Sequence, residues 1–288
     1  MTPVGQIVLA LLEGTVSGLL LALTAVGLSL VFGVMRIVNV AHGEFFMLGA
    51  VLAWVVTSAT GSFLAAVAVA PVLVAGIAAA ADRLVLRPVR YAPEATIVAT
   101  IGLLYILQQL ILGLYGPEAR AVAPPLAGVV EFPWFGYSRY KLVAAALAGL
   151  VLLGTWRLVS ATTLGLYMRA TQQDPEVAQA FGVPVHRVYS AAFALGAALA
   201  AVAGVLVVPV QQAHYLMGLD ALLLSFMVVT IGGLGRLGGT LVAAFLVGLV
   251  DGVVSIFFTP TLARIVASLL VAGVLVARAG GLFDGRGG

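Results

Sequence analysis

Three polar or charged side chains and a neighbouring arginine interrupt an otherwise apolar stretch of the chain. Within a bilayer, a charged group costs about 2.5–3.5 kcal/mol on insertion scales, so such groups usually face protein or water. A glycine among them offers a point where the backbone can break, and broken helices at membrane depth are tolerated where they line a cavity. The functional interpretation is a substrate path or gate formed by Asn39, His42, Gly43 and Glu44. The structural interpretation pairs Arg36 with Glu44 at the surface and buries His42 in a packed interface, and the residues alone favour it.

A second group of residues has the composition of a short helix with defined ends. Asp174 is a preferred N-cap, Pro175 suits the first helical position, and Glu176 in the first turn complements the helix dipole. Gly182 fits the left-handed residue after the last turn, and Pro184 prevents continuation. These signals predict a helix within a polar segment of the chain.

The predicted helix covers residues 175–181 and is too short to be stable alone, since isolated helices under ~12–15 residues are marginal in water. Val177 and Phe181 are four positions apart and form one apolar face. Two interpretations stay open for this face. Either it packs on the cytoplasmic ends of the protein's own membrane helices, or it inserts into a groove of a partner.

Composition indicates that membrane helices position both groups. Of the 288 residues, 62% are hydrophobic and 9% are charged, whereas a soluble domain is roughly 45–50% apolar and about 25% charged. An ordinary soluble or disordered protein is therefore excluded. The net charge of +3 is too small to indicate nucleic acid binding, and the absence of cysteine removes disulfides and cysteine-ligated metals. No metal site is expected.

The apolar runs predict an all-α polytopic membrane protein with about eight or nine transmembrane helices, some of them short or interrupted. One crossing takes about 20 apolar residues. The chain is expected to form a single transmembrane domain over 1–288, with a flexible Gly-rich tail at 279–288. The predicted spans are 10–34, 44–58, 62–82, 95–115, 141–159, 189–209, 220–233, 239–258 and 262–277.

The distribution of Lys and Arg predicts the orientation in the membrane. If Arg83, Arg87 and Arg90 lie in the cytoplasm, alternation of the spans places ten of the 14 Lys and Arg residues inside and four outside. The N-terminus is then outside and the C-terminus is cytoplasmic. The connection 116–140 is external, and the connection 160–188 is the longest cytoplasmic piece.

A second interrupted stretch, VTIGGLGRLGGTLVAAF at 229–245, is rich in glycine. Like the polar stretch at 32–50, it precedes a helix of glycine and small apolar residues. Paired interrupted segments can mark repeats around a central path, so an internal inverted repeat is predicted. The alternative is that these glycines only let helices pack closely.

The stretch GLSLVFGVMRIVNVAHGEFFMLGA resembles the signature of LivH-type permeases, the inner-membrane subunits of branched-chain amino-acid ABC importers. The residues that match the family's N-F-A-H-G-E-x-Y/F-M-x-G core are Asn39, Ala41, His42, Gly43, Glu44, Met47 and Gly49. Val40 replaces the common Phe. The runs LGLYMRATQQDPEVAQAFGVPVHRV and TIGGLGRLGGTLVAAFLVGLV resemble the family's coupling segment and its Gly-rich C-terminal block. The three blocks follow the family's order along most of the chain.

The resemblance gives the short helix a role, because a permease helix of this kind docks in a groove of the ATPase and transmits its motion. The coupling segment would be 160–188. Its coupling helix would comprise Asp174, Pro175, Glu176, Val177, Ala178, Phe181 and Gly182. Glu176-Val177-Ala178 departs from the Glu-Ala-Ala of many importers.

The resemblance also implies partners in a prokaryotic inner membrane. These are a second permease of LivM type, two ATP-binding subunits of LivG and LivF type, and an extracytoplasmic substrate-binding protein. The chain has no G-x-x-x-x-G-K-[ST] phosphate loop. ATP and Mg are therefore expected on the ATPase subunits, and this chain is expected to bind no cofactor and to be no enzyme. Few fixed charges in the spans favour a neutral or zwitterionic cargo, such as a branched-chain or other neutral amino acid.

An alternative function is that of an ion-coupled secondary carrier or a channel for a small neutral solute. Such a protein would use a membrane-embedded ion site, for which Glu13, Glu44 and Asp251 are candidates. His214 and Asp220 are expected near the external surface, in contact with solvent. An intramembrane enzyme is disfavoured, since the H-E-x-x-H motif of metal-dependent hydrolysis is absent.

Overall fold

The structure is a computed structural model that describes residues 2–258, 262, 265, 266, 269 and 273. Its helices are α1 (Pro3–Met35), α2 (His42–Thr60), α3 (Phe63–Ala81), the π-helical turn η1 (Asp82–Leu86), α4 (Pro93–Tyr115), α5 (Arg139–Ala161), α6 (Thr163–Gln173), α7 (Pro175–Ala180), α8 (Val185–Val207), α9 (Met217–Gly232) and α10 (Leu237–Phe257). A short antiparallel hairpin joins β1 (Val129–Glu131) to β2 (Gly136–Ser138), with Val130 opposite Tyr137.

The prediction of an all-α polytopic membrane protein is confirmed. Seven helices are long and apolar enough to cross a membrane: α1, α2, α3 continued by η1, α4, α5, α8 and α10. The shorter apolar helix α9 corresponds to the predicted span 220–233. The predicted span 262–277 falls mostly outside the described residues, and the predicted tail at 279–288 falls wholly outside them.

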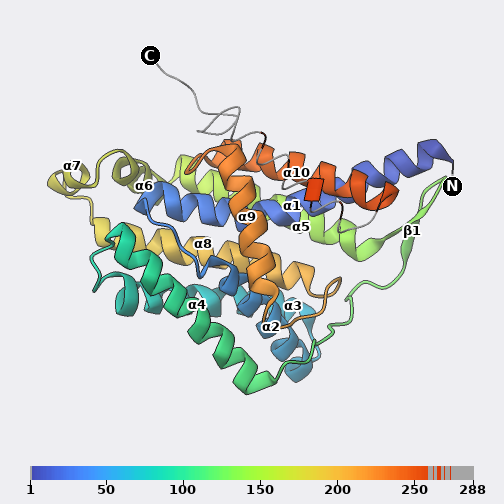
Figure 1. Cartoon of the computed structure of the whole chain (residues 1–288), viewed down its shortest axis with the longest axis horizontal. Coiled ribbons are helices and arrows are strands. Elements are labelled where there is room, and N and C mark those ends of the chain that lie inside the picture. The colour runs from blue at the N-terminus through green and yellow to red at the C-terminus, as the bar shows by residue number, and fades with distance from the viewer. Residues whose placement is uncertain (1, 259–261, 263–264, 267–268, 270–272, 274–288) are drawn as a thin grey trace, which may run out of the picture.

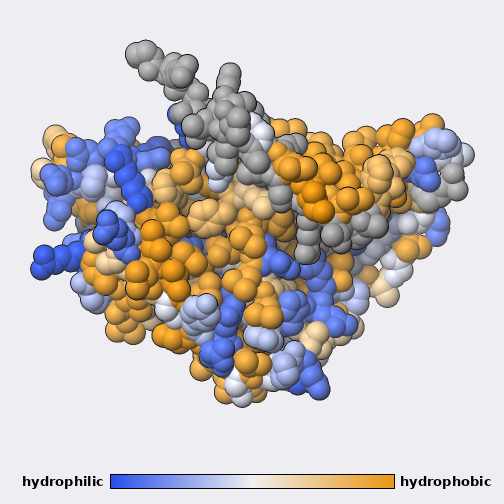
Figure 2. Space-filling model, viewed as in Figure 1, coloured by the Kyte–Doolittle hydropathy of each residue, from blue (hydrophilic) through white to orange (hydrophobic). Residues whose placement is uncertain are grey.

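Helices α1, α5, α8 and α10 lie roughly along the long direction of the molecule, α4 runs obliquely, and α9 runs across them (Figure 1). The N-terminus and β1 lie at one end of the molecule, and α6 and α7 lie at the opposite end (Figure 1). Hydrophilic residues gather at the α6–α7 end, whereas apolar residues cover much of the face between the two ends (Figure 2). The segments predicted to be external and cytoplasmic thus occupy opposite ends of the bundle.

Small residues bring the central helices into backbone contact. The antiparallel helices α1 and α10 meet along a seam on which a Cβ added to Gly14 would lie 2.8 Å from the carbonyl oxygen of Gly248. A Cβ on Gly27 of α1 would lie 2.6 Å from the carbonyl oxygen of Gly196 in α8. Glycine at such positions lets membrane helices approach closely, as expected from the small-residue content of the sequence.

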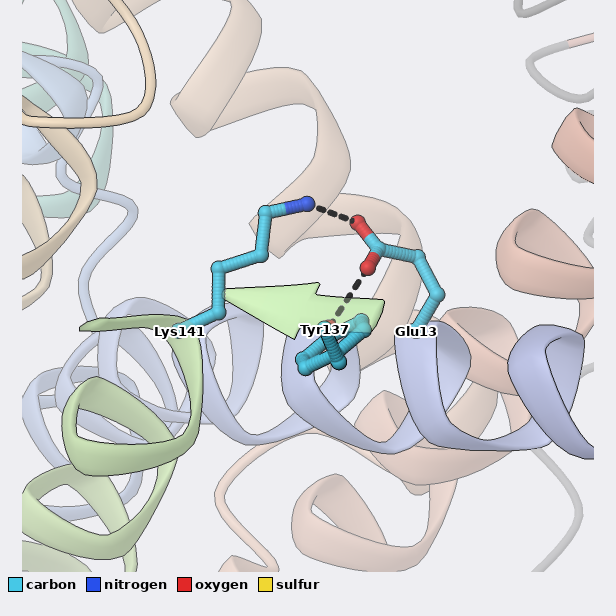
Figure 3. Close-up of polar contacts among 3 residues, drawn as sticks. All are labelled: Glu13, Tyr137 and Lys141. Atoms are coloured by element: carbon cyan, nitrogen blue, oxygen red, sulfur yellow. Dashed lines mark hydrogen bonds and ion pairs between the residues drawn. The ribbon is translucent and has the colours of Figure 1, made fainter. Parts of the chain in front are cut away.

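The hairpin is attached to the bundle by a three-residue cluster, the Glu13 clasp (Figure 3). Glu13 of α1 accepts hydrogen bonds from the Tyr137 hydroxyl at 2.5 Å and from Lys141 Nζ at 2.6 Å. Burial, together with the neighbouring Glu13 carboxylate, raises the pKa of the Tyr137 hydroxyl above its ordinary value, so the hydroxyl stays a donor at neutral pH. The clasp therefore joins α1, β2 and α5.

Replacing Glu13 with glutamine is expected to loosen the hairpin without unfolding the bundle. The ion pair with Lys141 is lost, while the helix contacts that bury most apolar area remain. Hydrogen exchange at the amides of 129–138 should become several-fold faster. Glu118→Gln is the matched control, because Glu118 is exposed and its nearest approach to Arg120 is 3.9 Å. Equal exchange in the two variants would contradict the clasp.

Candidate functional site

The interrupted stretch begins where α1 ends. Arg36 caps α1 in a left-handed conformation with φ of 54°, and the chain then runs without helix until α2 begins at His42. Gly43 lies inside the first turn of α2 and is absent from the residues with positive φ. The expectation that the backbone breaks at Gly43 is therefore wrong, because the break precedes it.

The break is buried inside the bundle. Asn39, His42 and Glu44 are each 0% exposed. The Val40 amide donates to Thr100 Oγ1 of α4 at 3.2 Å, and the Ala41 amide donates to Asn39 Oδ1 at 3.1 Å. These bonds replace the helical ones that the unwound backbone has lost.

His42 packs against the middle of α1. Its Nε2 lies 3.0 Å from the Thr24 carbonyl oxygen, a distance at which a ring N–H donates to the carbonyl. The Phe45 ring approaches the His42 ring edge-on, with centroids 6.5 Å apart. The interpretation of His42 as part of a packed interface is confirmed.

The predicted ion pair between Arg36 and Glu44 is wrong. Glu44 Oε1 accepts from Gln108 Nε2 of α4 at 3.2 Å. Arg36 remains at the end of α1, where its guanidinium donates to the Gln172 carbonyl at 3.0 Å. The reason is that α2 carries Glu44 into the interior, away from the end of α1.

Replacing Gln108 with leucine is expected to destabilise the protein by about 1–3 kcal/mol, because the Glu44 carboxyl group then loses its buried partner. The neighbouring Gln109 is exposed on the other side of α4, so Gln109→Leu is the control and should be near neutral. The measurement is the thermal unfolding midpoint of the detergent-solubilised protein. A midpoint for Gln108→Leu as high as that of the control would refute the assignment.

Gly43 has a packing role instead. A Cβ on Gly43 would lie 2.0 Å from the carbonyl oxygen of Gly218 in the first turn of α9. The N-terminal turns of α2 and α9 therefore meet in backbone contact. The predicted inverted repeat paired 32–50 with 229–245, whereas the segment that contacts the start of α2 is the start of α9. The repeat itself stays a prediction.

A cavity of about 310 Å³ opens beside this contact, at the lower end of the volumes of small-molecule sites, about 300–1,000 Å³. It lies between α1, the start of α2, the segment from the end of α8 to α9, and α10. Its lining residues are Ser17, Leu20, Leu21, Thr24, Phe46, Val207, Gln211, His214, Met217, Asp220, Ala221, Leu224, Val247, Gly248, Asp251 and Ser255. Apolar walls with a few converging polar groups are typical of ligand sites.

The predicted path residues do not themselves line this cavity but support its walls. His42 bonds the carbonyl of Thr24, a lining residue, and Gly43 packs on Gly218 beside the lining residue Met217. His214 and Asp220 were predicted to lie near the external surface in contact with solvent. Asp220 is exposed and His214 is half-buried, and both also line the cavity, which was not predicted. The signal that could have found Asp220 is that it is an acidic residue in the first turn of an apolar helix.

The three acids proposed as an ion site are not brought together. Glu13 belongs to the clasp and Glu44 bonds Gln108, whereas Asp251 lines the cavity. Within the described residues, no group of three or more His, Asp or Glu side chains is arranged to hold a metal ion. The geometry gives the ion-coupled alternative no support.

The short helix forms as predicted, one residue shorter at its end. Asp174 Oδ1 accepts from the amides of Glu176 at 2.9 Å and Val177 at 3.0 Å, which satisfies the first turn of α7. Phe181 is its C-cap, and Gly182 takes the expected left-handed conformation with φ of 85°.

The apolar face of α7 is exposed. Phe181 is 85% exposed and Val177 51%, while Ala178 on the inner side is 6% exposed. The part of the chain that the structure describes therefore leaves this face uncovered. The helix preceding it, α6, was not predicted, and it places α7 at the far end of the bundle (Figure 1).

A bundle of membrane helices with a buried break, a ligand-sized cavity beside it and a short exposed amphipathic helix at one end has the features of a membrane transport protein. The chain belongs to the family described as branched-chain amino acid transport system / permease component, whose model matches residues 10–277. It is therefore a permease component of an ATP-binding-cassette importer.

Similar proteins of assigned function cover nearly the whole chain. One is the high-affinity branched-chain amino acid transport system permease protein BraD of Pseudomonas aeruginosa, 26% identical over 94% of each chain. Another is LivH of Escherichia coli K12, 26% identical over 94% of this chain and 93% of LivH. A probable LivH of Methanocaldococcus jannaschii is 26% identical over 83% of this chain and 78% of its own length. No solved structure matches the chain significantly.

Proposed function

We propose that this permease carries branched-chain or other neutral amino acids across a prokaryotic inner membrane, driven by separate ATPase subunits. The observation that carries the proposal is α7, a capped helix of six residues that exposes Phe181 and Val177 at one end of the bundle. A helix this short is marginal alone. Its exposed apolar face is suited to a groove on another protein.

The cavity fits a small zwitterion. Asp220 and Asp251 place acidic side chains at the cavity, which attracts a cargo ammonium group, and Leu20, Leu21 and Val247 offer apolar surface to an aliphatic side chain. The start of α9 also lines the cavity, but Asp220 already occupies its first turn, so the cargo carboxylate is not assigned to this helix end. The named relatives transport branched-chain amino acids, which have these features.

The proposed assembly comprises this chain, a second LivM-type permease, two LivG- and LivF-type ATPases and an extracytoplasmic binding protein. ATP and Mg would be held by the ATPases, which would meet the coupling segment 160–188. The N-terminus and the hairpin would then face outward and the C-terminus the cytoplasm. The gate of the path would include Asn39, His42, Gly43 and Glu44, because their contacts position the start of α2 against α1, α4 and α9.

The test is uptake of radiolabelled leucine into proteoliposomes that hold the permease purified together with its co-purifying subunits. ATP enclosed in the vesicle lumen, on the side of the ATPase subunits, is expected to drive uptake that ionophores leave unchanged. Uptake that follows an ion gradient and ignores ATP would establish the secondary carrier instead. ATP-driven uptake of a different solute would retain the importer and replace the cargo.

A further inference from the structure

Arg36 connects α1 to the base of the coupling helix. Its Nη2 donates to the carbonyl oxygens of Gln172 at 3.0 Å and Gln173 at 3.4 Å. These are the last carbonyls of α6, where the helix dipole favours a cation and where a charged donor strengthens the bond. The next residue is Asp174, which is both the C-cap of α6 and the N-cap of α7. The guanidinium is therefore bonded to the junction between the two helices.

Gln172 extends the connection to the α9–α10 turn. Its Nε2 donates to the Gly235 carbonyl oxygen at 3.4 Å. Gly235 has φ of 77°, and a Cβ added to it would lie 2.8 Å from Gly33 Cα in the last turn of α1. The end of α1 and the α9–α10 turn are thus in backbone contact, and the side chains of Arg36 and Gln172 join the end of α6 to both.

The elements that meet here lead to both parts of the candidate site. Arg36 is followed directly by the buried break that carries Asn39 and His42. From the α9–α10 turn, α9 leads back to Asp220 and α10 leads on to Asp251, which both line the cavity. A displacement of α6 and α7 therefore has a contact path to the break and to the cavity walls that α9 and α10 form.

We infer that Arg36 and Gln172 are positioning residues that transmit movement of the coupling helix to the break and to the α9–α10 turn. This inference rests on the proposed function, since it presumes an ATPase that moves α7. Arg36 contacts no cargo in this role. It acts by making α1, α6 and α9–α10 move together.

The experiment compares leucine molecules taken up per ATP hydrolysed by proteoliposomes of the complete complex. Arg36→Gln removes the charge and is expected to lower this ratio on the order of tenfold, while ATP hydrolysis and subunit assembly persist. Arg36→Lys keeps the charge but replaces the planar guanidinium, whose Nη2 contacts both carbonyls, so it should restore part of the ratio. Arg157→Gln is the control, because Arg157 is exposed at the end of α5 and the described structure gives its side chain no polar contact.

Each outcome decides one question. If the unmodified protein shows ATP-driven uptake, and the number of leucine molecules taken up per ATP is the same in Arg36→Gln and Arg157→Gln, the inference is overturned and the proposed function stands. Absence of ATP-driven uptake in the wild type overturns the proposed function, and the inference with it. If Arg36→Gln does not assemble, Gln172→Met decides, because it removes only the amide that reaches Gly235 and should lower the same ratio.

Discussion

Gly43→Ala is expected to destabilise the bundle by about 3 kcal/mol or more, the upper range for overpacking a core. The added Cβ would lie 2.0 Å from the carbonyl oxygen of Gly218 and 2.8 Å from Leu222 Cβ. The first of these neighbours is backbone and cannot rotate away. The starts of α2 and α9 must therefore separate, which also disturbs the cavity wall at Met217.

The measurement is the thermal unfolding midpoint and the yield of monodisperse protein in mild detergent. Gly102→Ala in α4 is the matched control, since a Cβ there meets no atom within 4 Å. Alanine has the higher helix propensity, so this control should be neutral or up to about 1 kcal/mol more stable. Equal midpoints for the two variants would show that the α2–α9 contact is not a tight one.

Phe181→Asp is expected to weaken association with the ATPase subunits by about 30-fold or more, equivalent to about 2 kcal/mol, as for an aromatic anchor at an interface. Phe181 is 85% exposed, so its replacement removes no internal packing. The new carboxylate would have to enter an apolar groove unpaired, which adds a desolvation cost. Leucine uptake should fall with the association.

Co-purification of the ATPase and leucine uptake are the two measurements for Phe181→Asp. Gln179→Asp places the same charge on the same helix at another exposed position. This control should retain both the co-purifying ATPase and leucine uptake. Normal association and uptake in Phe181→Asp would mean that α7 is not the docking helix. Loss of both in the control as well would point to helix destabilisation by charge rather than to a lost anchor.

Local signals explain why much of the fold was predictable. Long apolar runs predicted eight of the helices, because a long uncharged apolar segment is the clearest signal of a helix that crosses a bilayer. The ends of α7 were predicted to within one residue because capping depends on neighbouring residues, here Asp174, Pro175 and Gly182. Helix α6 was missed because it mixes polar with apolar residues, and its boundary signals, the Thr162 N-cap and Pro175 after its C-cap, were not used to define a helix.

The candidate site was predictable only in part, because its contacts join distant residues. The polar stretch was singled out by its cost in a bilayer, and the structure does bury Asn39, His42 and Glu44. Their partners could not be read from spacing, since Gln108 is 64 positions from Glu44. The cavity was missed for the same reason: its walls come from helices at both ends of the chain, which only the folded bundle brings together.

The glycine seam between α1 and α10 has a consequence for how the cavity can open. Gly14 and Gly18 of α1 lie on Gly248 of α10, and a Cβ on Gly252 would lie 2.6 Å from the Ala10 carbonyl oxygen. Backbone packed on backbone leaves no side chains whose rotamers could change as the helices slide. The two helices therefore form one wall of the cavity that keeps its internal geometry. The facing wall, α9 and the start of α2, is joined in the same way at Gly218 and Gly43, so the width of the cavity depends on the spacing between the two walls.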